Sequence, residues 1–156
     1  MWYSFDEIQE KIETVLNQFL TNENELLMID SNELTISSKF SAYLALEFPE
    51  WDVDCEYIRD MTEVKRLKKD GTNVRIIPDI VIHHRLSNDN LMVIEVKKSP
   101  PYFLPDQEVK DDLVRLQKMT SDEKYNYHFG LFVLFYIKEK SGKSPILKFF
   151  QNSKVF

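Results

Sequence analysis

The chain has 156 residues, of which 43% are hydrophobic and 13% aromatic, which is enough to build one apolar core and argues against disorder. The formal net charge of −6 excludes binding to nucleic acid through overall positive charge, although a local basic stripe can coexist with an acidic remainder. The single cysteine, Cys55, excludes an internal disulfide and a cysteine-based zinc site, and it predicts a reducing, cytoplasmic setting. No apolar run reaches the ~20 residues of a membrane-spanning helix, and the chain begins without a signal-peptide pattern. We therefore expect a single cytoplasmic domain over residues 1–156.

Two helices are predicted in the first third of the chain. Ser4-x-x-Glu7 and Asp30-x-x-Glu33 both have the spacing of a capping box, in which two side chains satisfy the free N–H groups of a helix start. Apolar residues recur at helical spacing after each box. The first helix is expected to end near residue 20, and the second is expected to end at Pro49, which cannot continue a helix.

A strand and a polar loop follow. Residues 51–59 alternate between apolar and acidic side chains, a pattern that predicts a half-exposed strand. Residues 61–73 are polar and are expected to form a loop. The basic residues of this loop are Lys65, Arg66, Lys68 and Lys69. They are expected either to contact phosphate groups or to lie in solvent.

The middle of the chain predicts a β-hairpin of two buried strands. Residues 75–83 and 91–96 are rich in β-branched and apolar residues on both faces, as in strands that are covered on both sides. The polar segment 87–90 is the expected turn. Pro78 has no N–H to donate, so it predicts a bulge or an unpaired position in the first strand.

The last third predicts a helix and two more strands, over residues 108–119, 129–137 and 146–150. The full order is helix, helix, three strands, helix, strand, strand. Helices on both sides of a mixed sheet then give an α/β fold of the α+β, mixed-sheet kind.

Two acids are predicted to meet in the hairpin. Asp79 and Glu95 lie equally far from a turn centred near Ser87, so pairing of the strands sets them opposite each other. Carboxylates that are close and half buried repel unless a cation lies between them, and their oxygens suit a hard ion such as Mg²⁺ or Mn²⁺. Lys97 shares the strand face of Glu95. The alternative is an ion cluster in which Lys97 pairs with one of the acids and no metal binds.

These residues resemble the signature of the PD-(D/E)xK nuclease superfamily, with Pro78-Asp79 in one strand and Glu95-Val96-Lys97 in the next. The resemblance extends over most of the chain, from the acid-rich helix upstream to the helix after the hairpin. It implies a restriction-endonuclease-like αβββαβ core with one extra helix at the N-terminus. It also implies an enzyme that hydrolyses phosphodiester bonds with a Mg²⁺-activated water.

The resemblance also implies roles for particular residues. Asp79, Glu95 and the main-chain carbonyl of Val96 would hold the metal, and Lys97 would orient the water or stabilise charge on the phosphate. Glu33 is the candidate third acid, both catalytic and metal-binding, although it also fits a capping box. Glu56 competes for that place from the neighbouring strand.

Other polar residues carry weaker signals. Asp112 and Gln117 on the later helix would approach the site in many relatives, but both are expected to be ordinary solvent-facing helix residues. His83 and His84 are adjacent in a strand and point to opposite faces, so they cannot form one metal pair.

The expected function is a metal-dependent nuclease with nucleic acid as its partner, DNA in the first instance, and no membrane partner. Dimerisation stays open. Two alternatives remain: an inactive nuclease-like fold that serves as a binding or regulatory module, and a metal hydrolase that acts on a small phosphate ester.

Overall fold

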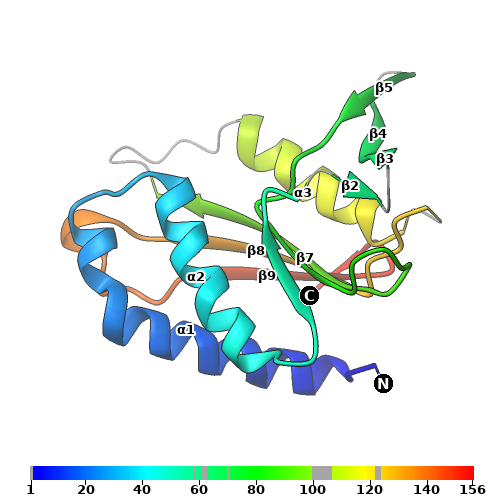
Figure 1. The fold of residues 1–156 in the computed structure, drawn as a ribbon. Helices are drawn as coiled ribbons and strands as arrows, with labels where there is room; N and C mark the ends of the chain where they lie inside the picture. The colour runs from blue at the N-terminus through cyan, green and yellow to red at the C-terminus, as the bar shows by residue number, and fades with distance from the viewer. Residues whose placement is uncertain (1, 58, 61–62, 70, 100–106, 122–123) are drawn as a thin grey trace.

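A six-stranded mixed sheet forms the centre of the computed structural model, which describes residues 2–57, 59–60, 63–69, 71–99, 107–121 and 124–156 (Figure 1). The strands lie in the order β1-β6-β7-β8-β9-β10, and only β7 and β8 run parallel to each other among these neighbours. Their bounds are Asp52–Cys55 for β1, Ile80–His83 for β6, Asn90–Lys98 for β7, Phe129–Phe135 for β8, Ile146–Gln151 for β9 and Lys154–Val155 for β10. The mixed α/β class predicted from the sequence is confirmed.

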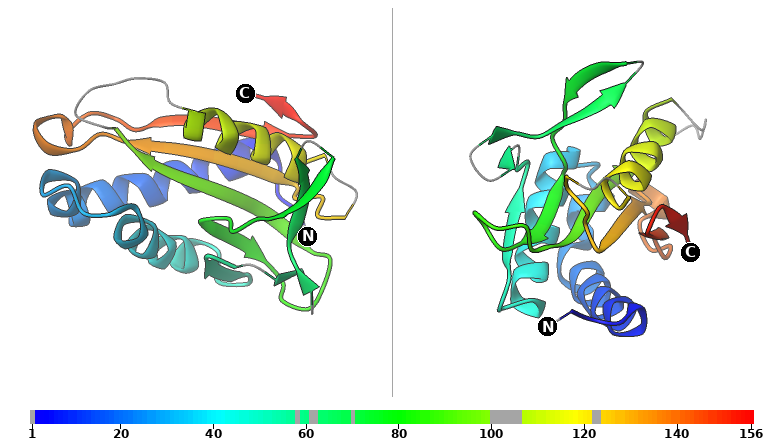
Figure 2. Two further views of the ribbon diagram at one scale, coloured as in Figure 1. Left: turned by 90° about the horizontal axis from the view of Figure 1, so that it is seen from above. Right: turned by 90° about the vertical axis from the view of Figure 1, so that its right-hand side faces the viewer.

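Helices cover both faces of this sheet. Helices α1 (Phe5–Met28) and α2 (Glu33–Glu47) lie on one face, and α3 (Gln107–Met119) lies on the other, as Figure 2 shows from two further directions. A 3₁₀ turn, η1 (Lys138–Lys140), follows β8. No helix in the described part of the chain combines the length and apolar character that crossing a bilayer requires.

The predicted C-terminal end of α1 and the predicted N-terminal cap of α2 are both wrong. The Ser4–Glu7 capping box is present and opens α1, but the helix continues past residue 20 to Met28. The polar segment produces only a kink, with non-helical backbone angles at Glu23, because packing of the apolar face on both sides of it holds the helix together. Asn32, not Asp30, caps α2: its side chain accepts a hydrogen bond from the Thr35 N–H at 2.8 Å.

The segment predicted as a polar loop forms β structure instead. Arg59–Asp60 (β2) pairs with Glu63–Val64 (β3), and Arg66–Lys69 (β4) pairs with Thr72–Arg75 (β5), both antiparallel. Gly71 turns the β4–β5 ribbon with a φ of 78°, which glycine adopts without steric cost. The predicted strand 75–83 is therefore divided. Its first residue ends β5, residues 76–79 are irregular, and β6 begins after Pro78, which stands outside the ladder.

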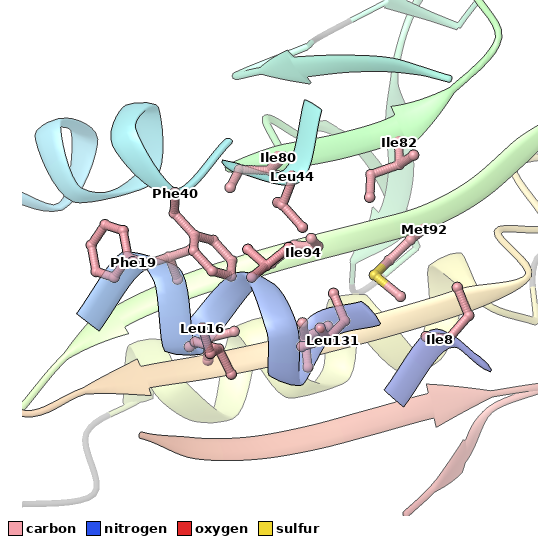
Figure 3. Packing of buried hydrophobic residues seen from close by; sticks show 14 of the residues in the cluster. Ile8, Leu16, Phe19, Phe40, Leu44, Ile80, Ile82, Met92, Ile94 and Leu131 are labelled. Atoms are coloured by element: carbon pink, nitrogen blue, oxygen red, sulfur yellow. The ribbon is translucent and has the colours of Figure 1, made fainter. Parts of the chain in front are cut away.

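The main core lies between the sheet and helices α1 and α2. Figure 3 shows Ile8, Leu16 and Phe19 of α1 and Phe40 and Leu44 of α2 facing residues of the strands. The strand residues labelled there are Ile80, Ile82, Met92, Ile94 and Leu131, and all of these core side chains are buried. A second cluster under α3 contains Val81, Val93, Leu116, Met119 and Phe132. Except at Leu91 and Met92, which pack in the same cluster, neighbouring residues of β6 and β7 therefore pack in opposite clusters, as continuous apolar runs predict.

Candidate active site

Asp79 lies directly before β6, at the point where the chain enters the sheet. Its Oδ2 accepts a hydrogen bond from the main-chain N–H of Val96 at 2.7 Å, and its carbonyl accepts one from Glu56 N–H at 2.9 Å. The register pairs Ile80 with Ile94, so one further step sets Asp79 opposite Glu95, as the sequence predicts. The carboxyl group of Asp79 is thus fixed against the second strand of the hairpin.

Glu95 is a buried carboxylic acid in the middle of the sheet. Only 2% of its surface is exposed, and it lies on the α3 face of β7. Burial and the neighbouring charge of Asp79 raise the pKa of Glu95 well above its usual range, and the guanidinium of Arg115 opposes that shift. Without a further cation, Glu95 therefore tends to hold a proton.

Lys97 lies at the same end of β7 and is surrounded by acids. Its Nζ is 3.5 Å from Asp112 Oδ2, 3.5 Å from Glu108 Oε2 and 3.8 Å from Glu33 Oε1. Burial alone would lower the pKa of Lys97, but these carboxylates outweigh it and the pKa is raised. Lys97 is consequently a held, permanently charged ammonium, unlike a strand-end lysine in solvent.

Glu33 reaches the site from the first residue of α2. Its Oε2 accepts a hydrogen bond from the Lys98 N–H at 3.2 Å, while its Oε1 faces Lys97. Because the helix is capped by Asn32, the Glu33 side chain is released from the predicted capping box. Burial raises the pKa of Glu33, and Lys97 partly offsets this effect.

Asp112 and Arg115, on one face of α3, complete the cluster. Asp112 is 3% exposed, and burial raises its pKa to about 6 against the pull of Lys97 and Arg115. Arg115 forms a close ion pair with Asp112, and its Nε is 3.3 Å from Glu95 Oε1. The prediction that Asp112 faces solvent is therefore wrong. Gln117 is partly buried and makes no side-chain hydrogen bond to the site in the described part of the chain.

The sequence contains a signal for Asp112 and Arg115. Val109, Leu113 and Leu116 recur at helical spacing and form an apolar stripe, and Asp112 falls within the same stripe. A charge in such a stripe requires a partner. Arg115 is three residues further along and meets Asp112 on the helix surface, which is the spacing that an i, i+3 pair requires.

The other candidates lie elsewhere. Glu56 is exposed and contributes only its main-chain N–H near Asp79. His83 is buried and its Nε2 lies 2.8 Å from Asp54 Oδ2, a structural pairing. His84 stacks on Trp51 with ring centroids 4.1 Å apart. The two histidines do not share a site.

The cluster carries more negative than positive charge. Without the exposed Glu108, the four acids Glu33, Asp79, Glu95 and Asp112 face two permanent cations, Lys97 and Arg115, so two formal negative charges are left over. Among the residues that the structure describes, Glu95 Oε1 and Asp112 Oδ2 are buried and accept no hydrogen bond, and their ion-pair contacts to Arg115 Nε and Lys97 Nζ are 3.3 and 3.5 Å long. A divalent cation would neutralise the excess and give these buried acids a partner.

The geometry limits how such a cation could be held. Within the described residues, no three side chains from histidine, cysteine, aspartate and glutamate are grouped as a ready-made metal site. Glu33 in particular is engaged by Lys97 and by the Lys98 N–H. Asp112 is likewise engaged by both Lys97 and Arg115, so the donors that remain are Asp79, Glu95 and the carbonyl of Val96. That carbonyl faces the same side as the Val96 N–H, because a strand residue presents both groups to one neighbour.

Comparison with known proteins gives little further guidance. No protein-family model matches the chain, and no curated protein matches it. A solved structure described as "Crystal structure of SSO0001" has a TM-score of 0.37 and 14% sequence identity, over 92% of this chain and 77% of that chain. A similarity at that level identifies neither a family nor an activity.

Proposed function

We propose that this protein is a metal-dependent nuclease of the PD-(D/E)xK type that hydrolyses phosphodiester bonds of DNA. The observation that carries this proposal is the excess of negative charge where Asp79 and Glu95 meet, with Lys97 and Arg115 on the same side of the sheet. An acidic pair beside a held lysine is the arrangement that water activation at a phosphate requires.

The topology supports the same proposal. With the short strands β2–β5 set aside, the order from α2 to β8 is α2, β1, β6, β7, α3 and β8, with β6 antiparallel to both β1 and β7, and β8 parallel to β7. This is the order that a restriction-endonuclease-like core would have, with α1 as the additional helix.

Mg²⁺ or Mn²⁺ fits the donor set. Mg²⁺ binds through one or two carboxylates and keeps several waters, so Asp79 and Glu95 are enough without a third acidic ligand grouped with them in the described residues. Asp79, Glu95 and the Val96 carbonyl would hold the ion. When bound, it would lower the pKa of a coordinated water and polarise the phosphate.

The side chains around the pair have separate tasks in this proposal. The Lys97 ammonium would orient the attacking water or stabilise charge that develops on the phosphate. Asp112 and Glu33 hold Lys97 in place from two different helices, at 3.5 and 3.8 Å. Arg115 holds Glu95 from α3. Glu33 is thereby a positioning residue, not a metal ligand.

Cleavage of supercoiled, linear and branched DNA with Mg²⁺ or Mn²⁺ tests the proposal. We expect Asp79→Asn, Glu95→Gln and Lys97→Met each to abolish cleavage with the fold retained. Asp89→Asn, in an exposed turn, serves as the matched control and should cleave normally. Full activity in any of the three site variants would remove that residue from the proposed role, and no cleavage by the unaltered protein on any substrate would contradict the proposal.

Thermal unfolding with added Mn²⁺ tests the metal separately from cleavage. A ligand present at 100 times its dissociation constant stabilises by about 2.7 kcal/mol, which for a chain of this size raises the Tm by roughly 5–10 °C. Asp79→Asn should lose this shift, whereas Asp89→Asn should keep it. An equal shift in both variants would place the bound ion elsewhere.

A second function is favoured by one observation: Arg115 and Lys97 already oppose two of the acids. A permanently paired cluster would suit an inactive nuclease-like fold that serves as a binding or regulatory module. In that case neither Mn²⁺ stabilisation nor cleavage would occur, while binding to nucleic acid would persist.

A further inference from the structure

The β4–β5 ribbon, residues 66–75, extends away from the six-stranded sheet, as Figure 1 and the right-hand view of Figure 2 show. We call it the basic arm. Its basic residues are Arg66, Lys68, Lys69 and Arg75, and Asp70 is its single acid. This is an unusual concentration of positive charge in a chain whose net charge is −6.

Two arginines of the basic arm are directly opposed. Arg66 pairs with Arg75 across the ribbon, and both are exposed. Neither forms an ion pair with any carboxylate in the described part of the chain. Like charges at directly opposite positions destabilise a β-ribbon, so this pair is unfavourable in the absence of an anion. Two fixed positive charges on one face would be compensated by an anionic partner.

The base of the arm is fixed to the body of the protein. The Tyr125 hydroxyl is hydrogen-bonded to the main chain of Arg66, and Ile76 N–H donates to the Lys65 carbonyl at 3.1 Å. Leu67 and Ile76 are buried in the cluster under α3. The arginine pair is therefore presented from an anchored ribbon on the same side of the sheet as Glu95 and Lys97.

The arm also lies close to the candidate active site. Arg75 precedes Asp79 by four residues, so their Cα atoms are at most about 14 Å apart. Phosphates follow one another every 3.4 Å of axis along each strand of duplex DNA. A single duplex placed at Asp79 can consequently reach Arg75 with a phosphate only a few nucleotides from the scissile one.

We propose that the basic arm binds the phosphate backbone of nucleic acid beside the cleavage position, with Arg66 and Arg75 as the contacting residues. This inference rests on the proposed function for its substrate. A two-stranded ribbon has the dimensions to enter the major groove of a duplex. It would supply local positive charge that the acidic chain lacks overall, and it would set the duplex in register with the acidic pair.

Fluorescence anisotropy with a labelled DNA duplex tests the arm without requiring catalysis. The protein carries Asp79→Asn, so that no cleavage occurs, and the buffer contains EDTA and a series of NaCl concentrations. Arg66→Ala/Arg75→Ala is compared with Lys39→Ala/Lys140→Ala, which removes the same charge from exposed positions on α2 and η1. Circular dichroism establishes that all variants are folded.

The arm variant should bind about 60-fold more weakly at 0.1 M salt if each arginine neutralises one phosphate, and its salt slope should fall by about 1.8. The control pair should change neither. Equal weakening in both variants, or none in either, would overturn the inference. The inference would also be overturned if the protein without the arm substitutions did not bind DNA but bound anionic vesicles or an acidic peptide through the same arginines.

Cleavage assays of the same arm and control substitutions, made in protein that retains the native Asp79, separate the two proposals. If DNA binding depends on the basic arm but no cleavage occurs in Mg²⁺ or Mn²⁺, the proposed role of the arm is supported and the proposed nuclease activity is contradicted. If the arm variant binds and cleaves DNA normally, the nuclease activity is supported and the proposed role of the basic arm is contradicted.

Discussion

Replacing Asp112 by asparagine should stabilise the metal-free protein in a pH-dependent way. The side chain is 3% exposed, and burial raises its pKa from 3.8 to about 6 although Lys97 and Arg115 lie beside it. The folded state therefore binds a proton more tightly than the unfolded chain. Stability from this group is present in full below pH 3.8 and is lost as the pH rises through about 6.

The size of the effect follows from that shift. Each unit of pKa difference corresponds to about 1.4 kcal/mol, so ionising Asp112 costs the folded state on the order of 3 kcal/mol. Asparagine resembles the neutral acid in shape and carries no charge at any pH. The change in unfolding free energy caused by Asp112→Asn should therefore become more favourable by most of that amount between pH 4 and pH 7.5. Comparing two pH values cancels any cost of the substitution that does not depend on pH.

Urea unfolding in EDTA at a series of pH values measures this difference. Asp111→Asn is the matched control, because Asp111 is the neighbouring residue on α3 and is hydrogen-bonded only to Gln107 at 3.0 Å among the described residues. It removes one carboxylate from the same helix without touching the cluster. If Asp112→Asn has the same effect at pH 4 and at pH 7.5, then the buried carboxylate carries no excess charge and the reasoning for a cation at this cluster fails.

Three further substitutions test the fold by denaturant unfolding. Gly130→Ala should destabilise by about 1–3 kcal/mol because its Cβ would lie 3.1 Å from both Phe150 Cβ and Thr120 Cγ2; Gly142→Ala, with open space around it, should not. Phe40→Ala should cost about 3–5 kcal/mol by leaving a cavity between α2 and the sheet, and a loss below 1 kcal/mol would contradict the packing. Asn32→Ala should cost about 1 kcal/mol through loss of the α2 cap, whereas Asn32→Asp should retain most of it.

The sequence predicts the central hairpin well and its surroundings less well. Short apolar runs that are rich in β-branched residues on both faces favour buried strands, so residue type predicts β6 and β7. The β4–β5 ribbon has no such pattern. Its pairing depends on a turn at Gly71 and on the anchoring of Leu67 and Ile76 under α3, which are tertiary contacts.

The candidate site divides in the same way. Asp79, Glu95 and Lys97 are close in sequence, so strand geometry was sufficient to bring them together. Glu33 and Arg115 arrive from helices 46 and 36 residues away from Asp79 along the chain, and their placement depends on how those helices pack. The capping-box pattern predicts Asp30 as the cap, whereas the residue that caps the helix is Asn32, directly before Glu33.

The opposition of Asp79 and Glu95 depends on a bulge that the sequence argument did not include. At the turn, His83 pairs with Asn90, which would set Asp79 opposite Ile94 if the ladder continued evenly. One extra residue in β7, Leu91, shifts the register, so that Ile82 pairs with Met92 and Ile80 with Ile94. Leu91 and Met92 both enter the core under α1 and α2, as the doubled residues of a bulge can. A slip of one residue exchanges the two faces of a strand, so without this bulge an isoleucine would face Asp79 and the acidic pair would not form.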